Sequence, residues 1–166
     1  MGNLNTLFSP DRVAVIGATE SEGSVGRAIM ENLQSGFTGE ILPVNPNTEE
    51  VFGLSAYDSV LDAPDVDLAV VVVPPSIVID AIEEAGEAGI TDVVVITAGF
   101  GESGSEGASR EQQLKTIAEE YDMNLVGPNC LGIISTPVGM NATFSPQSAL
   151  EGSISFMSQS GAFITA

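Results

Sequence analysis

A ten-residue loop rich in glycine and hydroxyl side chains is the segment of this sequence best suited to hold an anionic ligand. Residues 17–26 read Gly-Ala-Thr-Glu-Ser-Glu-Gly-Ser-Val-Gly and join an apolar run, Arg12–Ile16, to a segment with helical spacing. Such loops present backbone N–H groups at a helix N-terminus, where phosphate groups bind. The glycine spacing is not G-x-G-x-x-G, so a plain glycine turn is the alternative interpretation.

Four further apolar runs end, as the first one does, in small, polar or proline residues. Ligands of open α/β sheets bind outside the carboxyl ends of the strands, so we expect these five ends to form one crevice. The expected crevice residues are Gly17, Ala18, Thr19, Asn45, Pro46, Asn47, Pro74, Pro75, Ser76, Thr97, Ala98, Gly99, Gly127, Pro128 and Asn129.

The residue types exclude several chemistries within this chain. There is no histidine, so Ser-His-Asp and Cys-His nucleophile pairs and histidine metal sites cannot form in it. Cys130, the single cysteine, has no base beside it in the sequence, and we expect a small buried residue. An NAD site is disfavoured because the second apolar run ends at 43–47 without the carboxylate that binds ribose hydroxyls; Glu40 lies at its other end.

The elements that must position these ends follow from two alternating periodicities. Apolar runs predict strands, and apolar residues at helical spacing predict helices between them. The predicted strands are 12–16, 40–44, 68–73, 92–96, 124–126 and 131–134, and the predicted helices are 25–33, 55–61, 76–88 and 106–121. Strands that are apolar on both faces indicate an α/β fold, a Rossmann-type doubly wound parallel sheet with helices on both faces.

The domain organisation follows from the loss of this pattern near residue 137. We expect one domain over 1–136, a linker over 137–151, and the first strand of a second, truncated domain within 152–166. That strand would cover 152–157, and Ser158, Gln159, Ser160 and Gly161 would begin a helix. We therefore interpret the chain as a fragment of a longer protein.

The charge balance is strongly acidic. There are 23 acidic and four basic residues, and the net charge is −19. Nucleic acid is excluded as a partner and an anionic membrane surface is disfavoured, because both require clustered Lys and Arg. Adaptation to high salt and an acidic mesophilic domain both remain as interpretations. Without a signal peptide or membrane-length apolar run, and with one cysteine, we expect a cytoplasmic protein.

Six blocks of the sequence, in order, resemble the ADP-forming acyl-CoA synthetases, especially the acetate–CoA ligases. They are the run over residues 12–62 and the blocks DLAVVVVPP, ITAGFGESGSEG, VGPNCLGI, MNATFSP and SISFMSQSGA. The same CoA-binding fold occurs in the α subunit of succinyl-CoA synthetase and in some fused protein acetyltransferases.

The resemblance implies that coenzyme A is the ligand and where it lies. The glycine loop would hold the pyrophosphate, the second strand end the adenosine and 3′-phosphate, and the later strand ends the remainder. In that order the implied residues are Gly17, Ala18, Thr19, Ser24, Val25 and Gly26; Val44, Asn45, Pro46 and Asn47; and Val73, Pro74, Thr97, Ala98, Gly99 and, toward the thiol, Asn129. The family commonly has lysine where this chain has Asn47, and we hypothesise that Arg27 or salt cations replace it.

The resemblance also implies the reaction of the whole enzyme. Acyl-CoA, ADP and phosphate would be interconverted with acid, ATP and CoA through an acyl phosphate and a phosphohistidine in a later domain. Ser158–Gly161 would face that phosphate at the start of a succinyl-CoA-ligase-like, flavodoxin-like domain. The full enzyme would be an oligomer that contains an ATP-grasp domain or subunit and binds ADP, ATP and Mg²⁺. This chain alone would be inactive. Two alternatives are a CoA sensor domain fused to an acetyltransferase and an NAD-binding domain.

Overall fold

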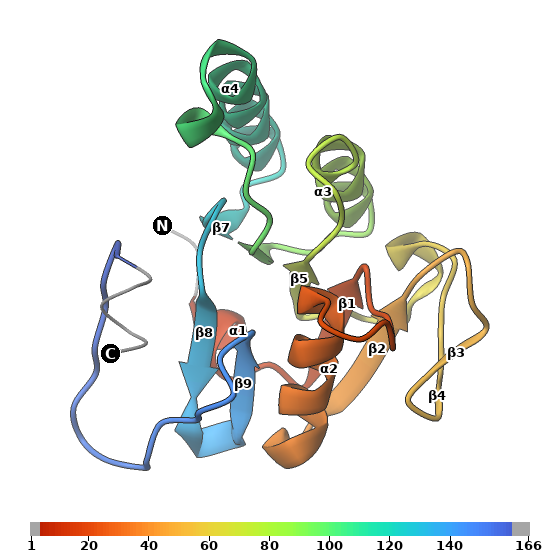
Figure 1. Cartoon of the computed structure of the whole chain (residues 1–166), viewed down its shortest axis with the longest axis vertical. Helices are drawn as coiled ribbons and strands as arrows, with labels where there is room; N and C mark the ends of the chain where they lie inside the picture. Colours follow the sequence, from red (N-terminus) through yellow and green to blue (C-terminus); the bar gives the residue numbers. More distant parts are fainter. Residues whose placement is uncertain (1–3, 161–166) are drawn as a thin grey trace.

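The computed structural model describes residues 4–160, and its centre is a parallel five-stranded sheet (Figure 1). The strands are β1 (Arg12–Ile16), β2 (Glu40–Val44), β5 (Leu68–Val71), β6 (Asp92–Val95) and β7 (Asn124–Val126), in the order β2-β1-β5-β6-β7. Every neighbouring pair is parallel. The predicted bounds of β1, β2 and β7 are confirmed, whereas β5 and β6 end before the predicted residues 73 and 96.

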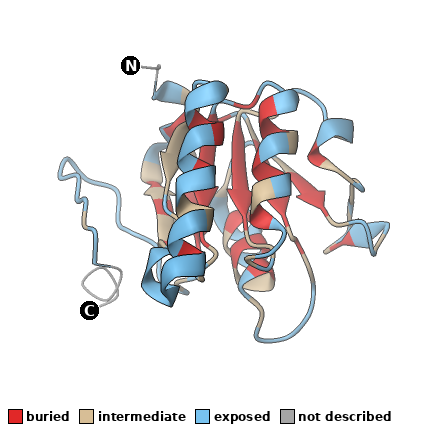
Figure 2. Cartoon of the chain, turned by 90° about the horizontal axis from the view of Figure 1, so that it is seen from above, coloured by how far each residue is buried: buried red, intermediate tan, exposed pale blue. Residues whose placement is uncertain are grey.

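Helices cover both faces of this sheet, as the sequence predicts. Val13 and Val15 of β1 pack in one core with α2 (Val25–Gly36), and Ala14 and Ile16 pack in the other with α3 (Val78–Glu87) and α4 (Ser105–Glu120). This alternation arises because successive side chains of a strand point to opposite faces. Figure 2 shows the buried strands between largely exposed outer helix surfaces.

The order of the strands places a ligand crevice. The chain passes from β1 to β2 at the sheet edge and then returns to β5, on the other side of β1. The strand order therefore reverses between β1 and β5, and in open α/β sheets the ligand crevice lies outside the carboxyl ends at such a point. Helix α2 begins here, with the hydroxyl of its N-cap Ser24 accepting the N–H of Arg27 at 3.2 Å.

The helix predicted over 55–61 is wrong. The chain instead forms a two-stranded hairpin of β3 (Glu50–Val51) and β4 (Leu54–Ser55), followed by a short 3-10 turn, η1 (Val60–Asp62). Phe52 and Gly53 both have positive φ, the combination that closes a two-residue hairpin turn. Tyr57 then bridges Val44 at the end of β2, so that this stretch is extended rather than helical.

Residues 137–143, expected in a linker, are part of the folded unit. β8 (Gly132–Ser135) and β9 (Met140–Thr143) form an antiparallel hairpin joined by a 3-10 turn, η3 (Thr136–Val138). Met140 and Ala142 are fully buried in the same core as α2. The apolar face of the hairpin packs against α2, so these residues belong to the folded domain and not to the expected linker.

The strand predicted over 152–157 is absent. Ile154 and Met157 are each more than 90% exposed, and no described strand is hydrogen-bonded to this segment. A strand needs a neighbouring strand to bond its backbone, so apolar residues alone do not produce one. At the predicted helix start the Ser158 hydroxyl accepts the N–H of Ser160 at 3.0 Å, and Gly161 lies outside the described residues.

Two short elements complete the fold. Helix α1 (Asn5–Phe8) precedes β1, and the 3-10 turn η2 (Gly101–Ser103) precedes α4. Across residues 4–160, no helix combines the length and apolar character needed to cross a membrane.

Candidate ligand-binding cleft

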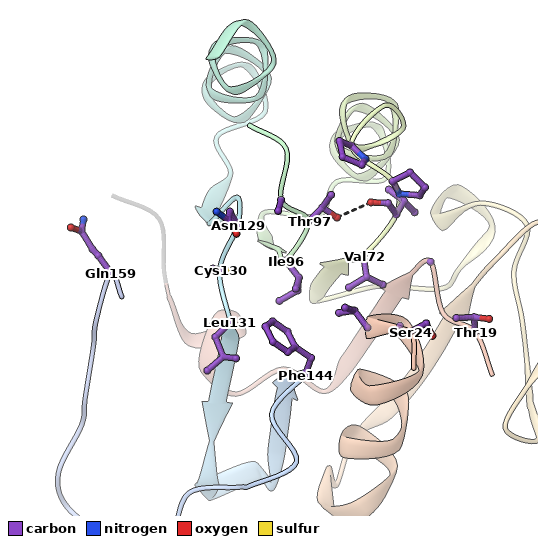
Figure 3. A pocket seen from close by; sticks show the side chains of 17 residues that line it. Thr19, Ser24, Val72, Ile96, Thr97, Asn129, Cys130, Leu131, Phe144 and Gln159 are labelled. Carbon is purple, nitrogen blue, oxygen red and sulfur yellow. Dashed lines mark hydrogen bonds between the residues drawn. The ribbon is translucent and has the colours of Figure 1, made fainter. Parts of the chain in front are cut away.

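A cleft of about 910 Å³ lies at the carboxyl ends of the sheet strands. The loop after β1, the first turn of α2, the ends of β5, β6 and β7, and the β9 exit contribute its walls (Figure 3). The predicted site residues that line it are Gly17, Thr19, Ser24, Val25, Gly26, Val73, Pro74, Pro75, Thr97, Ala98, Asn129 and Gln159.

Other predicted residues do not line this cleft, and several lining residues were not predicted. The predicted residues outside the lining are Ala18, Val44, Asn45, Pro46, Asn47, Ser76, Gly99, Gly127, Pro128, Ser158 and Ser160. The unpredicted lining residues are Val72, Ile96, Cys130, Leu131 and Phe144. These five are ordinary apolar or thiol side chains, and only their neighbours in the sequence, such as Thr97 and Asn129, carried a signal.

Two glycines let the loop after β1 pack directly against α2. Gly17 has φ of +100°, and its N–H donates to the Val44 carbonyl at 2.9 Å. A methyl group on Gly26 would meet the Gly17 carbonyl oxygen at less than 3.0 Å, a distance that real Cβ atoms essentially never show. The first turn of α2 therefore sits against the backbone of the loop, and Ser24, Val25 and Gly26 line the cleft.

The end of β2 braces this loop. The Asn45 side-chain amide donates to the carbonyl of Ala18 at 2.8 Å, and its carbonyl oxygen accepts the N–H of Asn47 at 2.9 Å. Ala18 is fully buried and Val44 nearly so. Asn45 therefore holds the loop in place, although none of Ala18, Val44 and Asn45 lines the cleft.

The later strand ends are joined by hydrogen bonds across the sheet. The Thr97 hydroxyl donates to the Val73 carbonyl at 2.7 Å (Figure 3), and the N–H of Asn129 donates to the Thr97 carbonyl at 2.9 Å. Asn129 has φ of +55°, a left-handed conformation that asparagine tolerates better than most residues. The loops after β5, β6 and β7 are thus held as one wall.

An apolar region surrounds Phe144 and Cys130. The Phe144 ring, 42% exposed, points toward Ile96 with Leu131 beside it (Figure 3). Cys130 is half-buried rather than buried, and its thiol lies 3.3 Å from the Val95 carbonyl, to which it donates. Burial raises the pKa of the Cys130 thiol to about 11, so it is protonated near neutral pH and is not an activated nucleophile.

The glycine-rich loop that follows β6, residues 99–104, is held by two carboxylates of the same chain. Glu102 accepts the N–H groups of Gly99 and Phe100, and Glu111 accepts the N–H of Gly101 at 3.1 Å. The Gly99 hydrogen bond is the largest cause that lowers the pKa of Glu102; Lys115 is the largest that lowers the pKa of Glu111. Both carboxylates are therefore ionised and engaged outside the cleft wall.

The sequence profile of the CoA-binding domain family matches residues 11–136. This match covers most of the chain and all five strands of the sheet. The chain belongs to the CoA-binding domain family.

Relatives of this CoA-binding domain are ADP-forming ligases. It is 51% identical over 98% of its length to acetate–CoA ligase [ADP-forming] I of Archaeoglobus fulgidus, covering 24% of that protein. It is 46% identical over 96% of its length to the acetate–CoA ligase [ADP-forming] I α subunit of Pyrococcus furiosus, covering 36% of it. The chain thus spans about a quarter to a third of the length of these relatives.

Solved structures agree with the fold. The dinucleotide-forming acetyl-coenzyme A synthetase 1 of Ca. Korarchaeum cryptofilum, in complex with phosphate and ADP, superposes with a TM-score of 0.93 at 42% identity, over 98% of this chain and 35% of that one. A crystal structure from Pyrococcus horikoshii OT3 gives a TM-score of 0.93 at 46% identity, over 97% of this chain and 37% of that one.

The cleft of this CoA-binding domain differs from the rest of the chain in charge. None of the residues that line it is Asp, Glu, Lys or Arg, although the chain has 23 acidic residues. Arg27, in the first turn of α2, does not line the cleft either; its guanidinium bonds Glu31 and the Glu20 carbonyl. An anion entering the cleft would therefore meet backbone and hydroxyl groups rather than carboxylates.

Proposed function

We propose that this chain is the CoA-binding part of an ADP-forming acyl-CoA ligase and holds CoA in the cleft at the β1–β5 reversal. The observation that carries the proposal is the uncharged lining of this cleft beside a helix N-terminus, in a chain of net charge −19. Amide N–H groups and a helix dipole stabilise phosphate groups without cationic side chains. Membership of the CoA-binding domain family selects CoA among the phosphate-bearing ligands.

The cleft suggests a role for each wall. The loop Gly17–Ala18–Thr19 and the start of α2 at Ser24–Val25–Gly26 would hold the pyrophosphate. Thr97 and Asn129, on the opposite wall, would contact the pantetheine amides, and the apolar side chains near Phe144 its methylene groups. The family resemblance would place the adenosine and 3′-phosphate at the end of β2, with Asn45 and Asn47, beyond the residues that line the cleft.

The reaction would belong to a larger assembly. In it, acyl-CoA, ADP and phosphate are interconverted with acid, ATP and CoA through an acyl phosphate and a phosphohistidine. This chain has no histidine, so the phosphohistidine must lie elsewhere, in a protein that also supplies an ATP-grasp domain or subunit and the Mg²⁺ nucleotide site. The α-subunit relatives favour this arrangement over a sensor domain fused to an acetyltransferase. We expect no ligase activity from this chain alone.

A ligand titration tests the proposal. A ligand that binds the native state raises the unfolding midpoint, and the stabilisation grows with the logarithm of the ligand concentration divided by its Kd. We expect CoA to raise the midpoint in molar KCl, and NAD and ADP to raise it far less. A shift with NAD but none with CoA would refute the proposal. Dephospho-CoA reports on the 3′-phosphate: a shift equal to that of CoA would mean that this phosphate is not contacted.

The acidic composition supports a proposal about the protein's surroundings. We infer a cytoplasm of high salt, where screening reduces the self-repulsion of 23 carboxylates against four basic side chains. The unfolding midpoint should then rise steadily from low to molar KCl. A midpoint that is independent of KCl would favour an ordinary acidic domain instead.

A further inference from the structure

The side chain of Arg27 contacts Glu20, Glu31 and Phe52. Its Nη1 donates to the Glu20 carbonyl at 2.7 Å, and its Nε donates to a Glu31 carboxylate oxygen at 2.8 Å. The guanidinium carbon lies over the Phe52 ring, 5.5 Å from the ring centre. Glu20 belongs to the glycine loop and Phe52 to the tip of the β3–β4 hairpin, so that one side chain joins both to α2.

The hairpin tip is also joined directly to the loop and the helix. A Glu20 carboxylate oxygen accepts the N–H of Phe52 at 2.6 Å, and the Gln34 side-chain amide donates to the Phe52 carbonyl at 3.1 Å. Arg27, Glu31 and Gln34 are four and three residues apart and therefore share one face of α2. Contacts among Glu20, Arg27 and Phe52 close a ring of three residues.

The backbone conformation of Phe52 is one that its contacts must stabilise. Phe52 has φ of +51° in a tight hairpin turn, a position where asparagine, aspartate and glycine are favoured. A bulky residue in this conformation is strained, and such strain persists only where surrounding contacts hold it. The ring contact with Arg27 and the two backbone hydrogen bonds of Phe52 supply that support.

We propose that Glu20, Arg27 and Phe52 form a clamp that holds the glycine loop in its ligand-binding shape, and that Arg27 is a positioning residue rather than a ligand of the 3′-phosphate. The proposal rests on the proposed function, because it assigns the loop to the CoA pyrophosphate. It is an alternative to the sequence-based hypothesis that Arg27 or salt cations replace the missing lysine. A preorganised loop binds more tightly because less conformational freedom is lost on binding.

A comparison of CoA with dephospho-CoA distinguishes a positioning role of Arg27 from a direct contact with the 3′-phosphate. Calorimetric Kd values for CoA and dephospho-CoA would be measured on the full 166-residue chain and on R27A, F52L and E20A. If the clamp acts through the loop, each variant weakens both ligands by the same factor, on the order of fivefold to tenfold. If R27A weakens CoA alone, or if F52L leaves both Kd values unchanged, the proposal is overturned.

Two further variants control for charge and for chemistry. R12A makes the same change in net charge as R27A. Arg12 pairs with Glu40 and Asp65 at the amino-terminal ends of the strands, opposite the cleft, so both Kd values should stay at the wild-type level. E20Q keeps a side-chain oxygen for the Phe52 N–H and should restore the affinity that E20A loses. Equal weakening in R12A, or no restoration in E20Q, would contradict the clamp.

A measurement without ligand distinguishes failure of the clamp from failure of the proposed function. Amide hydrogen exchange over residues 18–24 should accelerate in R27A and F52L and remain at the wild-type rate in R12A. Wild-type protein that binds neither ligand would refute the proposed function, and the exchange rates would still test the clamp. Unchanged exchange in both variants would overturn it.

Discussion

The amino-terminal ends of the sheet strands (the amino edge) and their carboxyl-terminal ends (the carboxyl edge) differ in where charged side chains lie. At the amino edge, Asp67 accepts the N–H groups of Asp11 and Arg12, both at 2.9 Å, and Arg12 pairs with Glu40 at 2.9 Å and Asp65 at 3.2 Å. At the carboxyl edge, the residues lining the cleft include no charged side chain. The acidic side chains are therefore absent from the lining of the cleft.

Both edges face the same physical requirement. A strand end presents backbone groups that need hydrogen-bond partners. The amino edge satisfies them with carboxylates of its own chain, which stabilises the fold. At the carboxyl edge, neutral groups bond the loops at the cleft wall, as Thr97 does to Val73 and Asn45 to Ala18. The carboxylates of Glu20 and Glu102 bond backbone N–H groups of residues that do not line the cleft. Substitutions at one edge should affect ligand affinity, and those at the other only stability.

The largest effect is expected from a matched pair of glycines. A Cβ on either Gly26, at the carboxyl edge, or Gly39, at the amino edge, would lie less than 3.0 Å from a backbone oxygen. Each Gly→Ala change should lower the free energy of unfolding by about 2 kcal/mol, because backbone must shift. Only Gly26→Ala should also weaken CoA, on the order of 100-fold, since its shift moves the loop. Equal CoA affinities in the two variants would contradict the claim that only the carboxyl edge affects ligand binding.

The thiol at the carboxyl edge should behave as a neutral group. Burial raises the pKa of Cys130 to about 11 from 9.0, so at about pH 8 its alkylation should be roughly 100-fold slower than in unfolded protein. The fold favours the protonated thiol, so its contribution to stability is complete below pH 9 and is lost as the pH rises toward 11. Iodoacetamide labelling followed by mass spectrometry measures the rate, and rapid labelling of native protein would contradict the assignment.

A buried carboxylate at the amino edge should matter for stability alone. Asp92 at the start of β6 is fully buried and accepts hydrogen bonds from the Thr6 hydroxyl and, at 2.8 Å, from the Asn124 amide. Asp92→Ala leaves both donors without this acceptor and should lower the free energy of unfolding by about 2 kcal/mol, as measured by urea denaturation. Asp92→Asn keeps one acceptor and should cost less. A change in CoA affinity would show that the two edges are coupled.

Two phenylalanines of equal exposure give the smallest expected difference. Phe144 is 42% exposed in the cleft wall, and Phe8 is 41% exposed on α1, next to the amino edge. Phe144→Ala should weaken CoA about threefold to fivefold, because it removes apolar contact area, and Phe8→Ala should leave the Kd unchanged. If the two variants bind CoA equally, Phe144 does not contact the ligand.

The sequence was sufficient to predict the sheet and the polar half of the cleft. The apolar runs of β1 and β2 are local signals, and their bounds agree with the structure. Gly17 and Thr97 were recognisable because a glycine or threonine directly after an apolar run has few roles other than a strand-end turn. The parallel order then brought these loops to one edge.

The parts that the sequence did not predict depend on contacts between distant segments. Phe144 reaches the cleft because β9 folds back onto α2, a contact without local signature. The 55–61 stretch is extended because Tyr57 bridges Val44, and the apolar residues Ile154 and Phe156 form no strand because no described strand lies beside them. Helical or strand periodicity reports the propensity of a segment, whereas its neighbours decide the outcome.

The uncharged lining of the cleft has a kinetic consequence. The summed field of a chain with net charge −19 opposes the diffusional approach of a polyanion, and this long-range field is screened by salt. Once bound, the ligand is surrounded by neutral groups whose hydrogen bonds are little affected by screening. The association rate constant should therefore increase with ionic strength while the dissociation rate constant stays nearly constant, the reverse of the salt dependence shown by proteins that attract phosphates with lysine and arginine.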